Sequence, residues 1–187
     1  MKLKSGIVFI VIVFSACLAF AQSEVDFQPK ALEKTLQKSG IETLSGIQEM
    51  KITDPTCNEI NGKYFLVTEN NENAYRYIYI GRVNSCRAGG CSVVHESLAT
   101  LDSEYFDYYI LFDENKTVRD VKVYNYQATH GHEITAKGWL KQFIGFNGSG
   151  SLKVDKNIDA ISGATISVYA ITADVENKTA LLKNLQL

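Results

Sequence analysis

The sequence predicts an α+β fold: a single domain in which an antiparallel β-sheet is flanked by helices. Two pairs of runs are rich in aromatic and β-branched residues, and a turn signal between the members of each pair indicates a β-hairpin. Near both ends of the chain, apolar residues recur at helical spacing, which indicates helices. The chain has only two prolines and no repeats, which favours one compact body.

The first 22 residues are typical of an export signal. Lys2 and Lys4 precede an uncharged apolar run over Gly6–Phe20, and a small-x-small cleavage site ends at Ala21. This run is shorter than the roughly 20 residues of a membrane-spanning helix. We therefore expect a signal peptide over residues 1–21 and a single domain over residues 22–187. Lipidation of Cys17, which would anchor the exported chain to a membrane, is the alternative.

Charge argues against nucleic acid as a partner. The formal net charge is −2, and it becomes −4 once the two lysines of the signal are removed. An acidic chain lacks the positive field that holds a polyanion or an anionic membrane.

The cysteines of the exported chain are odd in number, and they are Cys57, Cys86 and Cys91. An oxidising compartment favours disulfides, and the two glycines between Cys86 and Cys91 permit a small disulfide ring. A zinc site that also uses His95 is the alternative, but the four-residue spacer differs from the usual two-residue knuckle. We predict the Cys86–Cys91 disulfide and no metal.

The expected elements follow in chain order. Helices are predicted over Val25–Ser45, Lys137–Ile144 and from Thr165 to the C-terminus, and strands over Lys63–Glu69, Ala74–Val83, Tyr105–Asp113, Thr117–Tyr126 and, at an edge, Leu152–Ile158. Turns are expected at 54–55, 61–62, 70–73 and 113–116. The tyrosines of the strands are interpreted as core residues.

Two histidines, His130 and His132, would face one way on an extended strand, with Glu133 next in the sequence. Such a pair can bind a metal. Because no third ligand is evident, we expect a polar pocket instead.

Small residues directly precede the last predicted helix, in the stretch Asp159–Thr165. A helix that begins this way exposes backbone N–H groups at its positive end, where they can hold a phosphate. Gly163 would let the backbone approach a ligand, and the hydroxyls of Ser162, Thr165 and Ser167 are further donors. An ordinary N-cap, with Ser162 or Thr165 capping its own helix, is the alternative.

The same stretch resembles the flavinylation motif of the FMN-binding domain family, found in the C and G subunits of the sodium-pumping NADH:quinone oxidoreductase and of the Rnf complex. Asp159, Ser162, Gly163-Ala164-Thr165 and Ser167 satisfy its pattern. The resemblance implies FMN as the cofactor, esterified through its phosphate to Thr165 by a flavin transferase that uses FAD. It also implies that Asp159 helps this transferase to engage the motif.

An upstream segment is similar to a second family motif. It comprises Glu133-Ile134-Thr135 and Trp139-x-x-Gln-Phe-x-Gly. From this resemblance we expect His132, Glu133 and Thr135 to lie beside the flavin. The central motifs then lie in about residues 105–187.

These observations predict an extracytoplasmic electron-transfer flavoprotein, periplasmic or on the outer face of the membrane, rather than an enzyme with its own substrate. Its expected partners are the flavin transferase and membrane or periplasmic redox proteins. Two alternatives are an exported binding or assembly protein without a redox role and a flavin-dependent reductase of an extracellular acceptor.

Overall fold

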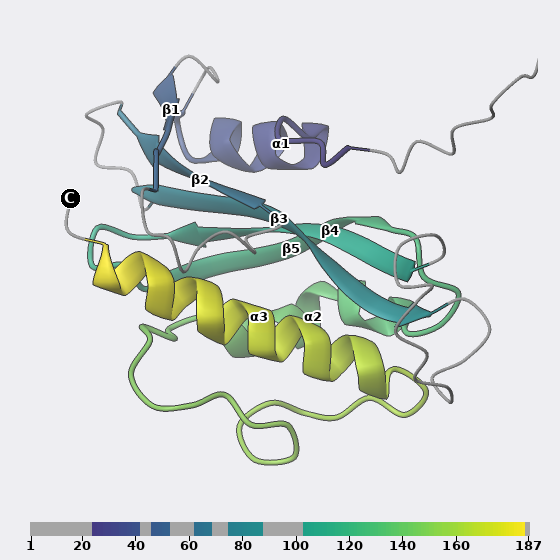
Figure 1. Ribbon diagram of the computed structural model, residues 1–187. Coiled ribbons are helices and arrows are strands. Elements are labelled where there is room, and N and C mark those ends of the chain that lie inside the picture. Colours follow the sequence, from purple (N-terminus) through teal and green to yellow (C-terminus); the bar gives the residue numbers. More distant parts are fainter. Residues whose placement is uncertain (1–23, 42–45, 53–61, 69–74, 88–102, 186–187) are drawn as a thin grey trace, which may run out of the picture.

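A computed structural model describes residues 24–41, 46–52, 62–68, 75–87 and 103–185. Its centre is one antiparallel sheet with a helix on each face (Figure 1). The predicted α+β fold is therefore confirmed.

The sheet is a simple meander of five strands in the order β1-β2-β3-β4-β5. Every neighbouring pair is antiparallel. The strands are β1 (Ile47–Glu49), β2 (Gly62–Val67), β3 (Tyr77–Arg87), β4 (Ser103–Phe112) and β5 (Val118–Tyr126). The short strand β1 was not predicted, whereas the other four match the predicted runs to within a few residues.

Strand β4 packs against a hydrophobic core on each of its two faces. Tyr108 and Ile110 belong to the core beneath one face, and Tyr109 and Leu111 belong to the core beneath the other. All four side chains are fully buried. The interpretation of the strand tyrosines as core residues is therefore confirmed for Tyr108 and Tyr109. Alternation of side chains between the two faces of a strand explains why this run is almost continuously apolar.

Helix α1 (Lys30–Lys38) covers one face of the sheet through Leu32 and Leu36 (Figure 1). The prediction of a helix over Val25–Ser45 is wrong at its start, because Pro29 is extended and the helix begins only at the next residue. At the other end, Gly40 adopts φ +81° and the N–H of Ile41 donates to the carbonyl of Leu36. This Schellman-type arrangement ends the helix.

Helix α3 (Thr165–Asn184) covers the opposite face, and it begins at the residue that the sequence predicts. Its apolar stripe is fully buried against the sheet and consists of Val168, Ile171, Val175 and Leu182. The packing fixes α3, and with it the predicted phosphate site, against this face of the sheet.

Short helical turns connect β5 to the long loop before α3. They are η3 (His132–Thr135), α2 (Lys137–Leu140) and η4 (Lys141–Phe143). The predicted helix over Lys137–Ile144 is thus confirmed as one α-helical turn continued by a 3₁₀ turn. His130 and His132 do not lie on an extended strand, the condition under which both would face one way, because Gly131 adopts φ +88° and His132 begins a 3₁₀ helix.

The predicted edge strand over Leu152–Ile158 is also wrong. This segment folds back on itself, with a single parallel bridge between Val154 and Ile158. Asn157 makes hydrogen bonds to the backbone of Lys153 and Ser151, and Asp155 adopts φ +64°. Local bonds from a turn-forming side chain therefore outcompete pairing with the sheet.

No helix of the described residues is long and apolar enough to span a bilayer.

Candidate functional site

The start of α3 combines an exposed hydroxyl residue with an open backbone turn. Thr165 is the first helical residue and is exposed, while Ala164 before it is buried. Gly163 adopts φ +82°, a conformation that favours glycine. Apart from Gly163 and its two chain neighbours, no atom of the described residues lies within 4 Å of the place that a Cβ at this glycine would occupy. There is therefore room for a ligand directly beside the turn.

The backbone donors of this helix end are free. Ala164 donates to the carbonyl of Ile161, and the next backbone bond is the 2.9 Å bond from the N–H of Val168 to Ala164. No side chain caps the helix. Within the described residues, the N–H groups of positions 165–167 thus have no acceptor.

This arrangement disagrees with the ordinary N-cap alternative, in which Ser162 or Thr165 would cap its own helix. Free N–H groups at the positive end of a 20-residue helix attract an anion. The residues present fit a phosphate monoester, with Thr165 as the nearest exposed hydroxyl.

Two side chains of the α2 and η4 turns hold the beginning of the motif. Trp139 donates its indole N–H to the carbonyl of Asp159 at 2.8 Å, and the N–H of Asp159 donates to Gln142 Oε1 at 2.8 Å. The backbone of Asp159 is therefore fixed on both sides, while the residue itself stays exposed. The second motif thereby positions the first.

Ser167, the third residue of α3, lies in its first turn and is buried. Its hydroxyl is 2.8 Å from Ser85 Oγ on β3 and 3.0 Å from the hydroxyl of Tyr126 on β5. Tyr126 also donates to the carbonyl of His130. These bonds direct Ser167 into the protein, whereas Ser162 and Thr165 face solvent.

Burial raises the pKa of Tyr126, with further contributions from Glu104 and Glu133, although its hydrogen bond with Ser167 acts in the opposite direction. The phenol therefore remains protonated and keeps its role as a donor at neutral pH.

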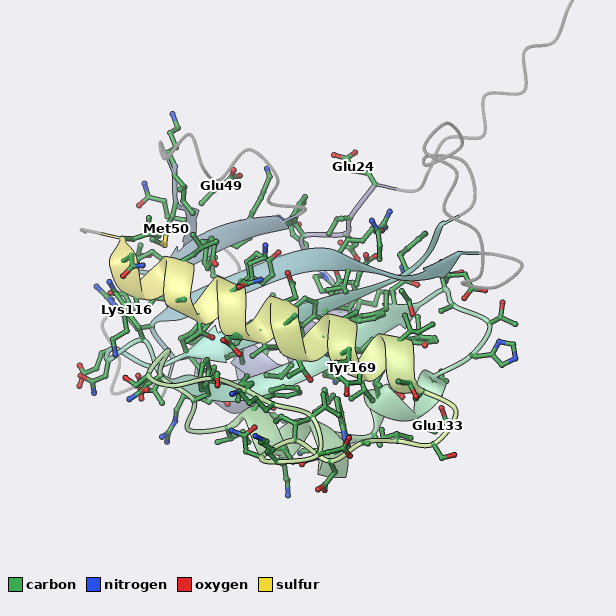
Figure 2. The ribbon with its side chains drawn as sticks, turned by 60° about the horizontal axis from the view of Figure 1, so that its bottom comes forward. Glu24, Glu49, Met50, Lys116, Glu133 and Tyr169 are labelled. Atoms are coloured by element: carbon green, nitrogen blue, oxygen red, sulfur yellow. The ribbon has the colours of Figure 1, made fainter. Side chains whose placement is uncertain are left out.

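The segment around η3 packs against the first turn of α3. A Cβ at Gly131 would lie 2.6 Å from Ser167 Oγ, which shows how closely this backbone approaches the helix. The exposed His132 lies edge-on to the ring of Tyr126, with 5.4 Å between the centroids of the two rings. Figure 2 shows Glu133 at the end of the molecule at which α3 begins.

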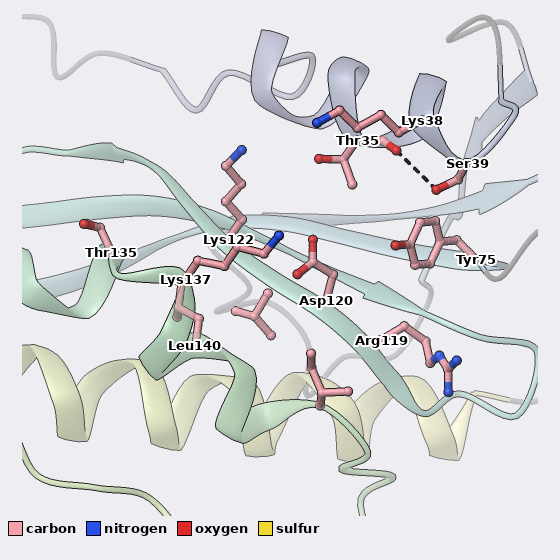
Figure 3. A pocket seen from close by; sticks show the side chains of 12 residues that line it. Thr35, Lys38, Ser39, Tyr75, Arg119, Asp120, Lys122, Thr135, Lys137 and Leu140 are labelled. Carbon is pink, nitrogen blue, oxygen red and sulfur yellow. Dashed lines mark hydrogen bonds between the residues drawn. The ribbon is translucent and has the colours of Figure 1, made fainter.

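Thr135 occupies a different position from His132 and Glu133. It lines a cavity beside β5, between α1 and α2 (Figure 3). The placement of all three residues beside a flavin stays a prediction.

An apolar surface accompanies the exposed threonine. Ile166 and Tyr169 are 41% and 53% exposed, which is unusual for large apolar side chains in this molecule. Tyr169 is four residues after Thr165, so the two lie on the same side of the helix. Tyr169 also borders a groove of about 430 Å³ between α3 and residues 152–156.

Sequence reasoning missed several residues that build this site. Ser85, Tyr126 and Gly131 come from elements distant in sequence, and no local pattern connects them to Ser167. Tyr169 had a signal, namely its spacing of four residues from Thr165. Cys86 is in β3, but Cys17, Cys57, Cys91 and His95 lie outside the described residues, so the disulfide remains a prediction.

Fold and site together define a class of protein: an α+β domain in which a helix without a side-chain cap exposes a threonine and, among the described residues, N–H groups that can attract an anion. Residues 105–179, which run from β4 through most of α3, match the FMN-binding domain family. An FMN-binding domain over this segment implies a flavin-carrying protein. No curated protein matches the chain.

Proposed function

We propose that this protein is an extracytoplasmic electron carrier whose FMN is esterified to Thr165. The observation that carries the proposal is the exposed Thr165 beside three free N–H groups and the open turn at Gly163. When bound, FMN would supply the capacity to accept and release one or two electrons. The ester leaves the ring unmodified and prevents its loss outside the cytoplasm.

The attachment step requires a flavin transferase and FAD. Thr165 would supply the oxygen that bonds to the FMN phosphorus as the bond from that phosphorus to AMP breaks, and the threonine proton would pass to a base of the transferase. The N–H groups of α3 would hold the resulting phosphodiester. Asp159 stays exposed for contact with the transferase while Trp139 and Gln142 fix its backbone.

The surroundings of Thr165 support carriage of electrons to another protein. Ile166 and Tyr169 offer apolar contact to a ring tethered at this position. An attached ring that is partly covered can still present an edge to a redox partner. Export would bring it to membrane or periplasmic partners.

A second candidate function is reduction of a small extracellular acceptor. The groove beside Tyr169 favours it, since an acceptor bound there would lie one helical turn from Thr165. Saturable reoxidation of the reduced flavoprotein by a small acceptor would support this function. A strictly linear dependence on acceptor concentration would support the carrier.

The test of attachment is the intact mass of the exported protein, made with and without a co-expressed flavin transferase. We expect the chain to gain the mass of one FMN less one water. Thr165→Val keeps the branched shape but removes the hydroxyl, so it should abolish the gain. Thr165→Ser, the matched control, restores an acceptor oxygen and should restore labelling. An unchanged adduct on the Val variant would exclude Thr165.

A further inference from the structure

A cavity of about 420 Å³ lies beside the edge strand β5, between α1 and the α2–η4 turns (Figure 3). No residue of α3 contributes to its lining. It is therefore separate from the site at Thr165. Its volume is within the range of sites that hold small molecules.

Positive charge is concentrated around this cavity. Lys38, Arg119, Lys122 and Lys137 line it, and they come from α1, β5 and α2. The whole chain carries a net charge of −2, so this gathering is local. Among the described residues, none of these four cations forms an ion pair.

A single carboxylate, Asp120, is part of the lining. Burial raises the pKa of Asp120, although Lys137, the N–H of Val121 and Lys122 act in the opposite direction. The carboxylate thus lies in a partly desolvated place, where charges interact more strongly than in water. Figure 3 shows Asp120 between β5 and the side chains of α1 and α2.

The cavity also has apolar and hydroxyl surface. Ile144 is 43% exposed and borders it. Thr135 lines it as well, and its hydroxyl has no hydrogen bond within the part of the chain that the structure describes. The hydroxyls of Thr35 and Ser39 are already bonded to α1 and belong to the wall.

We propose that this cavity binds a small organic anion, with its carboxylate or phosphate group among Lys38, Lys122 and Lys137 and its apolar part against Ile144. The cations would supply charge at the rim, and the Thr135 hydroxyl would supply a hydrogen bond. The alternative is that the lysines only protect the exposed edge of β5 from pairing with another chain. Such protection requires no cavity and no selectivity for anions.

The experiment is calorimetric titration of the full chain with 2-naphthoate and 1-naphthyl phosphate, which distinguish a carboxylate from a phosphate ligand. The neutral 2-naphthol and inorganic phosphate are controls for the apolar and the charged part. We expect saturable binding of at least one naphthyl anion, weaker binding at high salt, and much weaker binding of both controls.

Variants locate the site. Lys122→Gln and Lys137→Gln should each weaken binding about two- to fivefold, the range of a partly exposed ion pair. Asp120→Asn should strengthen it, because a competing negative charge is removed. Lys141→Gln removes an exposed lysine of the adjoining turn that does not line the cavity, and it should change nothing.

Circular dichroism verifies that each variant is folded. The proposal would be overturned if the folded wild-type chain bound neither anion, if 2-naphthol bound as well as 2-naphthoate, or if Lys122→Gln and Lys137→Gln bound like wild type.

Discussion

Gly131 and Gly163 share a backbone conformation but differ in their surroundings. Both adopt positive φ, +88° and +82°. A Cβ at Gly163 would meet nothing, whereas a Cβ at Gly131 would lie 2.6 Å from Ser167 Oγ and 2.9 Å from the Tyr126 hydroxyl. Gly131 is needed for the contact of η3 with α3, and Gly163 is needed for the turn alone.

Alanine substitutions should separate these two requirements. Gly163→Ala should lower the free energy of unfolding by about 1–2 kcal/mol, the cost of a left-handed alanine. Gly131→Ala should lower it by about 1–3 kcal/mol more, because overpacking adds to that cost. Urea denaturation of the flavin-free chain measures both. Equal losses would show that the backbone of η3 does not approach Ser167 as closely as described.

At the scale of elements, the α2 and η4 turns act as a support for the loop that leads into α3. Trp139→Phe removes the indole donor to Asp159 but keeps an aromatic ring beside Phe143. We expect the flavin transferase to label this variant more slowly, since the motif loses one of its two fixed points. Thr165 itself is unchanged, so complete labelling should still be reached.

The measurement is the rate of FMN incorporation into purified chain. Lys141→Ala, an exposed change in the adjoining turn, is the control and should be labelled at the wild-type rate. If Trp139→Phe also matched the wild-type rate, the bond to Asp159 would have no role in presenting the motif.

Helix α3 also carries a partly buried acid that faces the sheet, Asp174. Asp174 accepts a 2.6 Å hydrogen bond from the Tyr108 hydroxyl and lies 3.4 Å from the ammonium of Lys178. Burial raises the pKa of Asp174, and these two partners only partly oppose the shift. The folded chain therefore binds this proton more tightly than the unfolded chain does.

The sign of the pH dependence follows from linkage. The stabilising contribution of the proton is fully present below the unfolded pKa and is lost as pH rises through the higher folded pKa. Asp174→Asn cannot titrate, so the free energy of unfolding of wild type minus that of the variant should decrease as pH rises from about 3 to about 7. Urea denaturation across this range checks it. A flat difference would contradict the raised pKa.

Most of the elements could be predicted from the sequence because their signals are local. The turn at Asp113, whose carboxylate accepts from the N–H groups of Asn115 and Thr117, is an example. The prediction of a strand over Leu152–Ile158 is wrong because the side chain of Asn157 bonds to the backbone of its own neighbours, Ser151 and Lys153. Strand β1 is three residues long, too short for a periodic pattern.

For the site, the sequence predicted the position of Thr165 but not its support. The helix start and the exposed threonine depend on neighbours in the chain, so pattern and resemblance reach them. The bonds of Ser167 to Ser85 and Tyr126 join residues 82 and 41 positions apart. Only the meander of the sheet brings these residues together, and a single sequence contains no spacing that reveals it.

At the scale of the whole molecule, the two ends of the β4–β5 hairpin have different roles. The end at Tyr126 contacts the first turn of α3, whereas the turn at 113–116 lies at the opposite end (Figure 2 labels Lys116 and Glu133). The first and last of the nine residues of β5 are eight steps of about 3.4 Å apart, so roughly 27 Å separates the two ends. A charge at one end is therefore screened from the other, since this distance exceeds the Debye length of about 8 Å.

This separation provides a test of where the flavin ring lies. Glu133→Gln and Glu114→Gln each remove one negative charge from an exposed position, so both change the net charge equally. If the ring lies beside η3, only Glu133→Gln should raise the flavin midpoint potential, because the reduced anion forms more easily once a nearby negative charge is gone. A redox titration resolves the shift, since about 30 mV corresponds to roughly 1.4 kcal/mol for two electrons. Equal FMN content in both variants is the control. Equal potentials would place the ring away from Glu133 and would contradict the contact with η3.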